Sequence, residues 1–407
     1  MQSLPVSALD QRTAMMSPRQ AMKLKSVVIG VIGFLTLVDL FGTQAILPTL
    51  AMHYGASPAS IGFAVNATTI GMAISCIGVA LISQHIDRRH GVWISLALLA
   101  IPTSLLAFAP DLAVFTILRV VQGIFMAAAF TLTMTYLAEH FSAGETARAL
   151  AAYITGVVAS NLVGRLVSAT ATDLLGLHAN FFLFAALNLA GAALVYLNFD
   201  RMAAMASSGR TRSPLESWAE HLRNPALRAS FAIGFLILFA FIGVFTYVNF
   251  VLSGAPISLN SMSLGIIYFV FLPSMITTPL SGEVATRIGT RPALWLGLLI
   301  AGVGLGLLLS SKLEIVLAGM VLVGVGTFFA QAVGTGFVGR AAAADRGAAS
   351  GLYLASYYLG GLVGGALLGQ IFDRFGWSAC VLTVAVSLVL AAIIGLRLEV
   401  PEVGSNT

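Results

Sequence analysis

Long apolar stretches separated by short polar connections dominate this chain. Runs of about 20 mostly apolar residues have the length of a helix that crosses a bilayer, and the chain contains twelve such runs. They cover residues 26–50, 58–85, 91–109, 111–139, 145–172, 177–199, 225–252, 261–286, 291–310, 313–339, 346–372 and 376–397. The longest connection, residues 200–224, is polar and is expected to hold an amphipathic helix around Ser213–Arg223. The pattern predicts an all-α integral membrane protein.

The long connection divides the twelve predicted helices into two groups of six. We expect an N-terminal tail at 1–25, a six-helix half at 26–199, a linker at 200–224, a second half at 225–397 and a tail at 398–407. Residues 1–22 are too polar for a signal peptide, so the first apolar run is expected to be a transmembrane helix.

Composition excludes several classes of protein. The chain is 58% hydrophobic and 9% charged, whereas a soluble domain carries about 25% charged residues. Soluble enzymes, nucleic-acid binders and disordered proteins are therefore excluded. The net charge of +5 indicates no nucleic-acid partner, because the basic residues lie in short loops between apolar runs. Cys76 and Cys380 lie in different runs and imply no disulfide framework.

The basic residues also predict the orientation of the chain in the membrane. Cytoplasmic loops carry the excess of Lys and Arg, and 17 of the 21 such residues fall on one predicted side. The opposite loops hold Lys312 and Arg374, and Arg119 and Arg165 lie inside spans. Both termini and the linker are therefore predicted to be cytoplasmic.

An internal repeat relates the two halves. Residues 145–179 and 345–379 align without a gap at an offset of 200, which pairs Tyr153 with Tyr353 and Asp173 with Asp373. Matching Tyr and Asp residues in register are not explained by shared apolar composition. Paired halves are typical of transporters, in which one half rocks against the other around a central site.

Several motifs resemble those of the major facilitator superfamily. One loop reads Ser83-Gln84-His85-Ile86-Asp87-Arg88-Arg89-His90-Gly91, and a second runs from Gly282 to Arg291. The fourth span carries Arg119-Val120-Val121-Gln122-Gly123. The resemblance implies conformational gating by Asp87, Arg88, Gly282, Arg287 and Arg291, and proton coupling by Arg119 and Gln122. The family's antiporter motif is degenerate here, at Ser160–Arg165.

The resemblance is most specific to inner-membrane transporters of the drug:proton antiporter branch. It rests on Gly164-Arg165-Leu166, Phe328-Phe329-Ala330, Leu352–Gly360 and Gly376-Trp377. It covers nearly the whole chain and implies a twelve-helix transporter that acts as a monomer, without naming its substrate.

Ionisable groups inside the membrane are costly and indicate function. Asp39, Arg119 and Arg165 lie about 16, 12 and 10 Å from the outer ends of their spans, at 1.5 Å per residue. The family fold makes these spans neighbours, so we expect Asp39 between the two arginines, since an unpaired charge would cost several kcal/mol. Asp39 is either a proton carrier or one partner of a permanent ion pair. Arg119 either helps to expel its proton or is structural.

Arg165 shares a helical face with Asn161, Ser168 and Thr172. Arg165 either binds an anionic group of the substrate or neutralises Asp39, and Asn161 is a substrate-binding candidate beside it. Neutral polar residues among aromatic ones are further substrate-binding candidates, because such sites suit amphipathic organic molecules. These candidates are Thr43, Gln44, Asn66, Tyr247, Asn249, Tyr268, Gln331, Tyr353 and Tyr357.

The remaining motifs exclude other chemistry. The sequence has no metal-ligand spacing, nucleophile elbow or phosphate loop, so we expect no enzyme, no cofactor and no ATP-driven pump. Our hypothesis is a secondary transporter that exports a small amphipathic compound by proton antiport. A transporter of an anionic metabolite or metal-chelating compound is the alternative, and a non-transporting sensor or scaffold is an alternative of another class.

Overall fold

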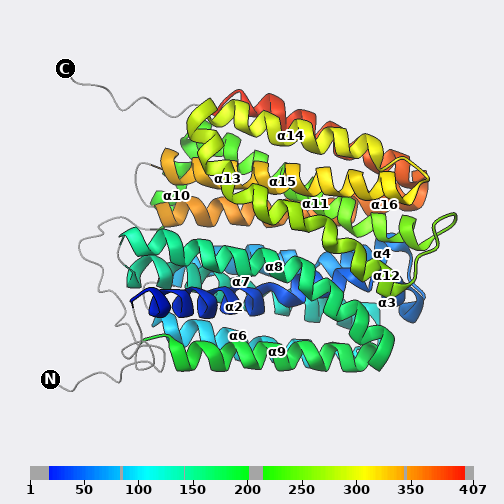
Figure 1. Cartoon of the computed structure of the whole chain (residues 1–407), viewed down its shortest axis with the longest axis horizontal. Helices are drawn as coiled ribbons and strands as arrows, with labels where there is room; N and C mark the ends of the chain where they lie inside the picture. The colour runs from blue at the N-terminus through cyan, green and yellow to red at the C-terminus, as the bar shows by residue number, and fades with distance from the viewer. Residues whose placement is uncertain (1–17, 83–85, 142, 201–213, 343–345, 399–407) are drawn as a thin grey trace. The chain divides into compact units, whose positions relative to one another are not determined.

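The computed structural model describes residues 18–82, 86–141, 143–200, 214–342 and 346–398, and the regular structure in these ranges is helical (Figure 1). The first part of the chain forms α2 (Pro18–Ala45), α3 (Leu47–Tyr54), α4 (Pro58–Asn66), α5 (Thr68–Ile82), α6 (Arg88–Leu105), η2 (Leu106–Phe108), α7 (Leu112–His140), α8 (Ala143–Leu175) and α9 (Leu177–Asn198). The second part forms α10 (Pro214–Arg223), α11 (Pro225–Ser253), α12 (Ser261–Ile267), η3 (Tyr268–Phe271), α13 (Leu272–Ile288), α14 (Thr290–Leu307), α15 (Leu313–Ala341) and α16 (Arg346–Gly395).

The helices account for the predicted twelve spans. Eleven helical stretches in the described ranges are long and apolar enough to cross a membrane, and the last of them is Gly347–Gly395. A continuous helix of 50 residues would extend about 75 Å, more than twice the hydrocarbon core. Its backbone leaves helical geometry at Gly376, where φ is +77°. The chain turns back there, from the orange to the red segment of Figure 1, so α16 contains two spans.

The predicted span 26–50 is interrupted at Ile46, between α2 and α3, and two further spans that the apolar pattern predicts as continuous are broken. Between α4 and α5 the Asn66 side chain donates to the carbonyl of Gly62, and Thr69 donates to the carbonyl of Asn66. Such side chains replace backbone bonds and let a helix bend or stop. At the second break, η3 precedes Pro273, whose ring removes one backbone donor. Apolar runs alone do not reveal either break.

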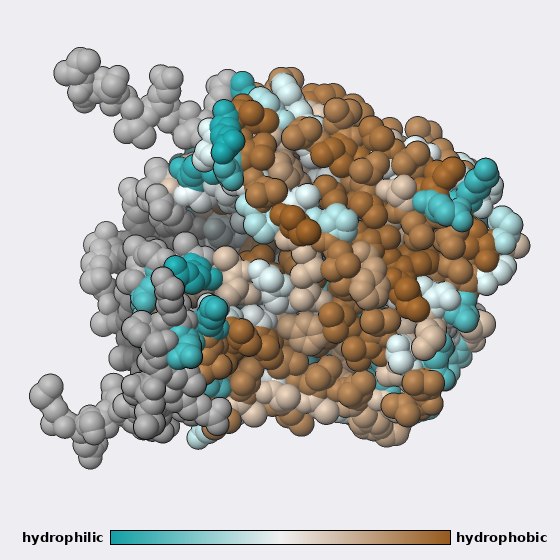
Figure 2. Space-filling model, in the orientation of Figure 1, coloured by the Kyte–Doolittle hydropathy of each residue, from teal (hydrophilic) through white to brown (hydrophobic). Residues whose placement is uncertain are grey.

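The chain forms two compact units. Unit 1 comprises Met1–Ile46, Ile74–Gly209 and Ser261–Tyr268, and unit 2 comprises Leu47–Ala73, Arg210–Asn260 and Phe269–Thr407. Apolar side chains cover the flanks of the helices and hydrophilic ones gather toward the helix ends (Figure 2). That distribution is expected of helices surrounded by lipid along most of their length.

Close packing of α2 on α8 organises unit 1. A Cβ atom added to Gly156 would overlap the carbonyl of Gly30, and one added to Gly164 would lie 3.0 Å from the carbonyl oxygen of Val38. Small residues at these positions let two helix backbones approach closely, as is common between membrane helices. The contact holds α2, and with it Asp39, in a fixed position against α8.

Unit 2 repeats this arrangement between α11 and α16. The Ser356 hydroxyl, at the position equivalent to Gly156, donates to the carbonyl of Phe231 at 2.9 Å. A Cβ atom on Gly364, which is equivalent to Gly164, would lie 2.6 Å from the carbonyl oxygen of Phe239. These carbonyls stand 201 residues after those of Gly30 and Val38. The sequence repeat is therefore a repeat of helix packing, as two homologous halves require.

A glycine substitution tests this packing. Gly156→Leu is expected to destabilise the protein by about 1–3 kcal/mol, because the new side chain meets backbone that can move only with α2. Gly302→Leu is the matched control, because Gly302 lies on an apolar helix with no atom within 4 Å of its added Cβ. Thermal unfolding of the two purified variants measures the difference. Equal stabilities would contradict the close contact.

Candidate functional site

A buried polar network inside unit 1 contains the intramembrane acid. Helix α2 supplies Asp39, α6 supplies Thr103, α7 supplies Arg119 and Gln122, and α9 supplies Asn188. Asp39 is 3% exposed and Arg119 is fully buried. Asp39, Arg119 and Gln122 thus come together as the sequence predicts, and two neutral residues that the sequence analysis did not select complete the group.

Hydrogen bonds fix the orientation of the network. The Asn188 amide donates to Asp39 Oδ2 at 2.7 Å and to Thr103 Oγ1 at 3.1 Å. The Thr103 hydroxyl also accepts from Gln122 Nε2 at 2.7 Å, and donates its own hydrogen to the carbonyl of Leu99 at 2.8 Å. The Asn188 amide thus links the Asp39 carboxyl group to Thr103, and Thr103 links it to Gln122.

Arg119 connects to the acid through two contacts. Its Nη1 donates to the Gln122 side-chain oxygen at 2.7 Å and to the backbone carbonyl of Asp39 at 3.4 Å. Its charge also interacts with that of the Asp39 carboxylate. The buried Asp39 carboxyl group therefore has one cation and neutral hydrogen-bonding groups beside it. Protonation would remove the negative charge of Asp39 and with it the attraction to Arg119. Proton coupling requires such a change in the interaction between helices.

Arg165 lies in a second buried cluster of unit 1. Its Nε donates to Asn161 Oδ1 at 2.9 Å, and its Nη2 donates to the side-chain oxygen of Gln44 at 2.5 Å. The guanidinium carbon lies 3.9 Å from the ring centre of Tyr268 and 5.7 Å from that of Phe41. Both distances allow cation–π attraction. The cluster joins a charged group to amide oxygens and aromatic faces, an arrangement suited to binding an anion.

The expected placement of Asp39 between two arginines differs from this geometry. Gln44 follows Asp39 by five residues, which corresponds to about 140° around a helix. Asp39 and Gln44 therefore point from different faces of α2, one toward Arg119 and the other toward Arg165. The sequence predicts that Asp39 and Arg165 lie at a similar depth in the membrane. Depth alone does not show which face of α2 points toward which arginine. Thr43, a further candidate, donates to the carbonyl of Asp39 at 3.1 Å.

One group of candidates in unit 2 links α4 and α11 to α16. Asn66 donates to the Thr246 hydroxyl at 2.9 Å, and Tyr247 donates to the carbonyl of Gly365. Asn249 donates to the carbonyl of Phe245 at 2.8 Å. These bonds tie side chains to helix backbone and to one another within the unit.

A second group in unit 2 joins α15 to α16. The Tyr353 hydroxyl donates to the Gln331 side-chain oxygen at 2.8 Å, and the Tyr353 and Tyr357 rings stack with centres 6.4 Å apart. Tyr353 is buried, whereas Tyr357 is partly exposed. Their aromatic faces and the amide provide amphipathic contacts of the kind that organic ligands use.

The loop motifs form contacts at the ends of helices. Asp87 caps α6 by accepting from the backbone N–H of His90 at 3.1 Å. Arg88 donates to both carboxylate oxygens of Glu139, at 3.2 and 3.1 Å, a pairing that joins the ends of α6 and α7. Ser83, which begins the first motif, lies outside the described residues.

The second motif is more exposed. Arg287 pairs with Glu283 one turn earlier on α13, and both side chains are more than half exposed. Gly282 lies on the same helix with open space beside it, and Arg291 lies in the first turn of α14. The two motifs thus share a sequence pattern but differ in the burial of their ion pairs.

Sequence reasoning missed Thr103, Asn188 and Glu139. Neutral polar residues are frequent in membrane helices, so Thr103 and Asn188 carry no signal until a charged partner is located. Glu139 lies at the end of a span, where an acidic residue does not by itself indicate function. Its spacing to the loop arginines could not be derived without the packing of α6 on α7.

Comparison with known protein sequences finds one family and related transport proteins. A sequence model of the Major Facilitator Superfamily matches residues 29–272 and 256–407. The inner membrane transport protein YnfM of Escherichia coli is 28% identical over 368 residues, covering 90% of this chain and 88% of that protein. An uncharacterized MFS-type transporter of Bacillus subtilis, YybF, is 26% identical over 360 residues, covering 88% and 89%.

Solved structures show the same fold. A bacterial homologue of the human lysosomal transporter Spinster, in an inward-facing and occupied conformation, has a TM-score of 0.74 at 14% identity, covering 94% of this chain and 97% of that one. The nucleoside transporter NupG has a TM-score of 0.73 at 13% identity, covering 93% and 99%.

Proposed function

Because this chain belongs to the Major Facilitator Superfamily and is a multi-pass membrane transporter, we propose that it exports a small amphipathic organic compound in exchange for protons. We place it in the bacterial inner membrane with both termini in the cytoplasm, as its basic residues predict. We take it to act as a monomer, with no partner beyond its substrate, protons and the lipid bilayer.

The buried Asp39 network is the observation that carries the proton-coupling proposal. Asp39 is a carboxyl group deep in a membrane helix, and such groups are found on proton pathways. Its polar neighbours are the Asn188 amide, the Thr103 hydroxyl and the charge of Arg119. Water that reaches the site from one side of the membrane would let Asp39 exchange its proton with that side.

The proposed cycle uses two states of this acid. With Asp39 ionised, the Arg119–Asp39 attraction holds α2 against α7. With Asp39 protonated, that attraction is lost and the two helices are free to adopt a second arrangement. Binding of the exported compound favours the first state and binding of the proton favours the second, so the two ligands are exchanged across the membrane.

The internal repeat supports a specialised role for these charges. At the offset of 201 that relates α2 to α11, Asp39 corresponds to Ala240. The same offset relates α7 to α15, and Met320 is the residue equivalent to Arg119. The second half therefore maintains equivalent helix packing with apolar residues at both positions. The fold does not require the charge pair, so we assign it to transport.

Inverted membrane vesicles with an acidified interior test the proposal. A panel of lipophilic cations, sugars and carboxylates is added while a lumenal probe reports pH. Antiport predicts that a transported compound releases lumenal protons in vesicles containing the protein and not in vesicles without it. A transported compound that moves protons in the opposite direction, or leaves pH unchanged, would contradict proton antiport.

The Arg165 cluster favours a second candidate, the transport of an anionic compound. The membrane-embedded parts of the spans hold two arginines and one deep acid, so they carry one surplus positive charge. Arg165 is fully buried in α8 against amide and aromatic groups. An anionic substrate group would neutralise that surplus where the guanidinium is already oriented.

A charge-removing variant separates the two candidates. Arg165→Gln is expected to raise the KM for a carboxylate substrate by about 10- to 100-fold, because a charge-assisted hydrogen bond contributes roughly 1.5–3 kcal/mol. Transport of a lipophilic cation should change little. Arg374→Gln, on a loop predicted to be outside, is the control. An unchanged KM for carboxylates would contradict anion binding at Arg165.

A further inference from the structure

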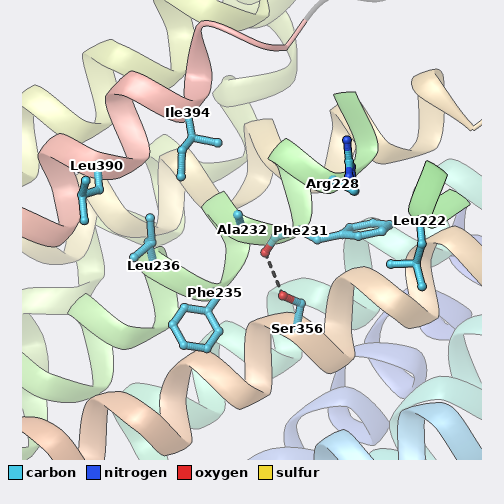
Figure 3. Close-up of a pocket in the computed structure, with 9 residues that line it drawn as sticks. All are labelled: Leu222, Arg228, Phe231, Ala232, Phe235, Leu236, Ser356, Leu390 and Ile394. Carbon is cyan, nitrogen blue, oxygen red and sulfur yellow. Dashed lines mark hydrogen bonds between the residues drawn. The ribbon is translucent and has the colours of Figure 1, made fainter. Parts of the chain in front are cut away.

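An apolar groove opens on unit 2 where three helices meet (Figure 3). Its volume is about 500 Å³, and α10, α11 and both spans of α16 line it. Leu222 comes from α10, Phe235 and Leu236 from α11, and Leu390 and Ile394 from α16. The candidate residues for proton coupling and substrate binding lie elsewhere, so the transport proposal leaves this groove unexplained.

The interior of the groove has little capacity for polar ligands. Ser356 is a polar side chain in its wall, and its hydroxyl already donates to the carbonyl of Phe231 at 2.9 Å. The other wall residues apart from Arg228 are alanine, leucine, isoleucine and phenylalanine. A hydrocarbon chain fits this lining, whereas a sugar or a peptide would lose its hydrogen bonds with water there.

Positive charge surrounds one end of the groove. Arg228 belongs to its wall and is exposed. Arg223 directly follows the wall residue Leu222, and Arg397 lies one turn beyond Ile394. Three arginines therefore lie in the wall or within three residues of it along the chain. Arginine side chains bind phosphate groups.

The predicted orientation of the chain places the start of the groove near the lipid headgroups of the cytoplasmic side. Helix α10 has charged residues on one side and Trp218 and Leu222, four residues apart, on the other, a pattern typical of helices that lie in the membrane interface. Helix α11 begins directly after it at Pro225. From Arg228 to Leu236 the groove follows α11 for about 12 Å toward the membrane interior, at 1.5 Å per residue.

We propose that this groove is a binding site for an anionic phospholipid of the cytoplasmic leaflet. The lipid phosphate would bind Arg228, and one acyl chain would lie along Phe235, Leu236 and Leu390. The positive charge selects an anionic headgroup over a zwitterionic one, and the apolar wall selects a lipid over a free phosphate. The proposal uses the predicted orientation of the chain but is independent of proton coupling.

Native mass spectrometry of the purified full chain tests the site with phosphatidylglycerol and phosphatidylcholine of identical acyl chains. We expect one retained phosphatidylglycerol and about a fivefold preference over phosphatidylcholine, because a basic residue near a headgroup contributes roughly that factor. Arg228→Gln should abolish the preference. Ala232→Trp should fill the groove and remove the bound lipid, and Arg340→Gln, an exposed arginine at the end of α15, should behave as wild type.

Several outcomes would overturn the proposal. Equal retention of the two lipids, or an undiminished preference in Arg228→Gln, would remove the role of the charge. Displacement of the lipid by inorganic phosphate alone would assign the site to a free anion. Displacement by a transported compound would assign the groove to the substrate. If Ala232→Trp fails to fold, Arg228→Gln and its control still decide the question.

Discussion

Replacing Asp39 with asparagine abolishes substrate-driven proton movement while the protein still folds and inserts. Asparagine has nearly the same shape, and its side-chain oxygen can accept the hydrogen bond from Asn188, but it cannot exchange a proton. In the vesicle assay the pH response of this variant should fall to that of vesicles without the protein. Exchange of labelled for unlabelled substrate should persist, since this process needs no net proton transfer.

A matched control separates this effect from the loss of any acid. Asp111→Asn changes an acid at the start of α7 that caps the helix by accepting from the backbone N–H of Val114 at 2.9 Å. Asparagine is an equally good cap, so this variant should retain full coupling. Proton release by Asp39→Asn at the wild-type level would show that Asp39 is structural.

Replacing Arg119 with methionine should destabilise the protein strongly, by about 3–5 kcal/mol. Removal of one member of a buried pair leaves the charge of Asp39 without its cation in a low-dielectric interior. It also leaves the Gln122 side-chain oxygen without the donor that now lies at 2.7 Å. Thermal and denaturant unfolding of the purified protein measures the loss.

The double variant Asp39→Ala/Arg119→Met distinguishes charge imbalance from poor packing. It places the residues of the second half, Ala240 and Met320, at the equivalent positions of the first. Because both charges are removed, the double variant should be more stable than Arg119→Met alone. Additive losses in the two single variants would show that the residues are not energetically coupled.

The sequence predicts the spans of this protein well, because each apolar run must match the thickness of a bilayer. The predicted span 111–139 and the observed α7 (Leu112–His140) differ by one residue at each end. The first helix begins earlier than expected, at Pro18 within the predicted tail. Hydropathy does not detect this extension, since residues 18–25 include Arg19, Lys23 and Lys25.

The candidate site was predictable only in part. Depth along a span can be counted, so Asp39 and Arg119 were expected to meet, and they do. The direction in which a side chain points depends on how helices are rotated against each other, and this separated Arg165 from Asp39. Rotation is set by close contacts such as that of Gly156 with Gly30, which one sequence does not reveal.

The most direct test of proton antiport uses purified protein in liposomes with a substrate gradient and no initial pH gradient. Under proton antiport, substrate leaving the vesicles drives protons inward, so the lumen acidifies with wild type and stays at constant pH with Asp39→Asn. Substrate movement with no change in lumenal pH, or with alkalinisation, would contradict proton antiport through Asp39.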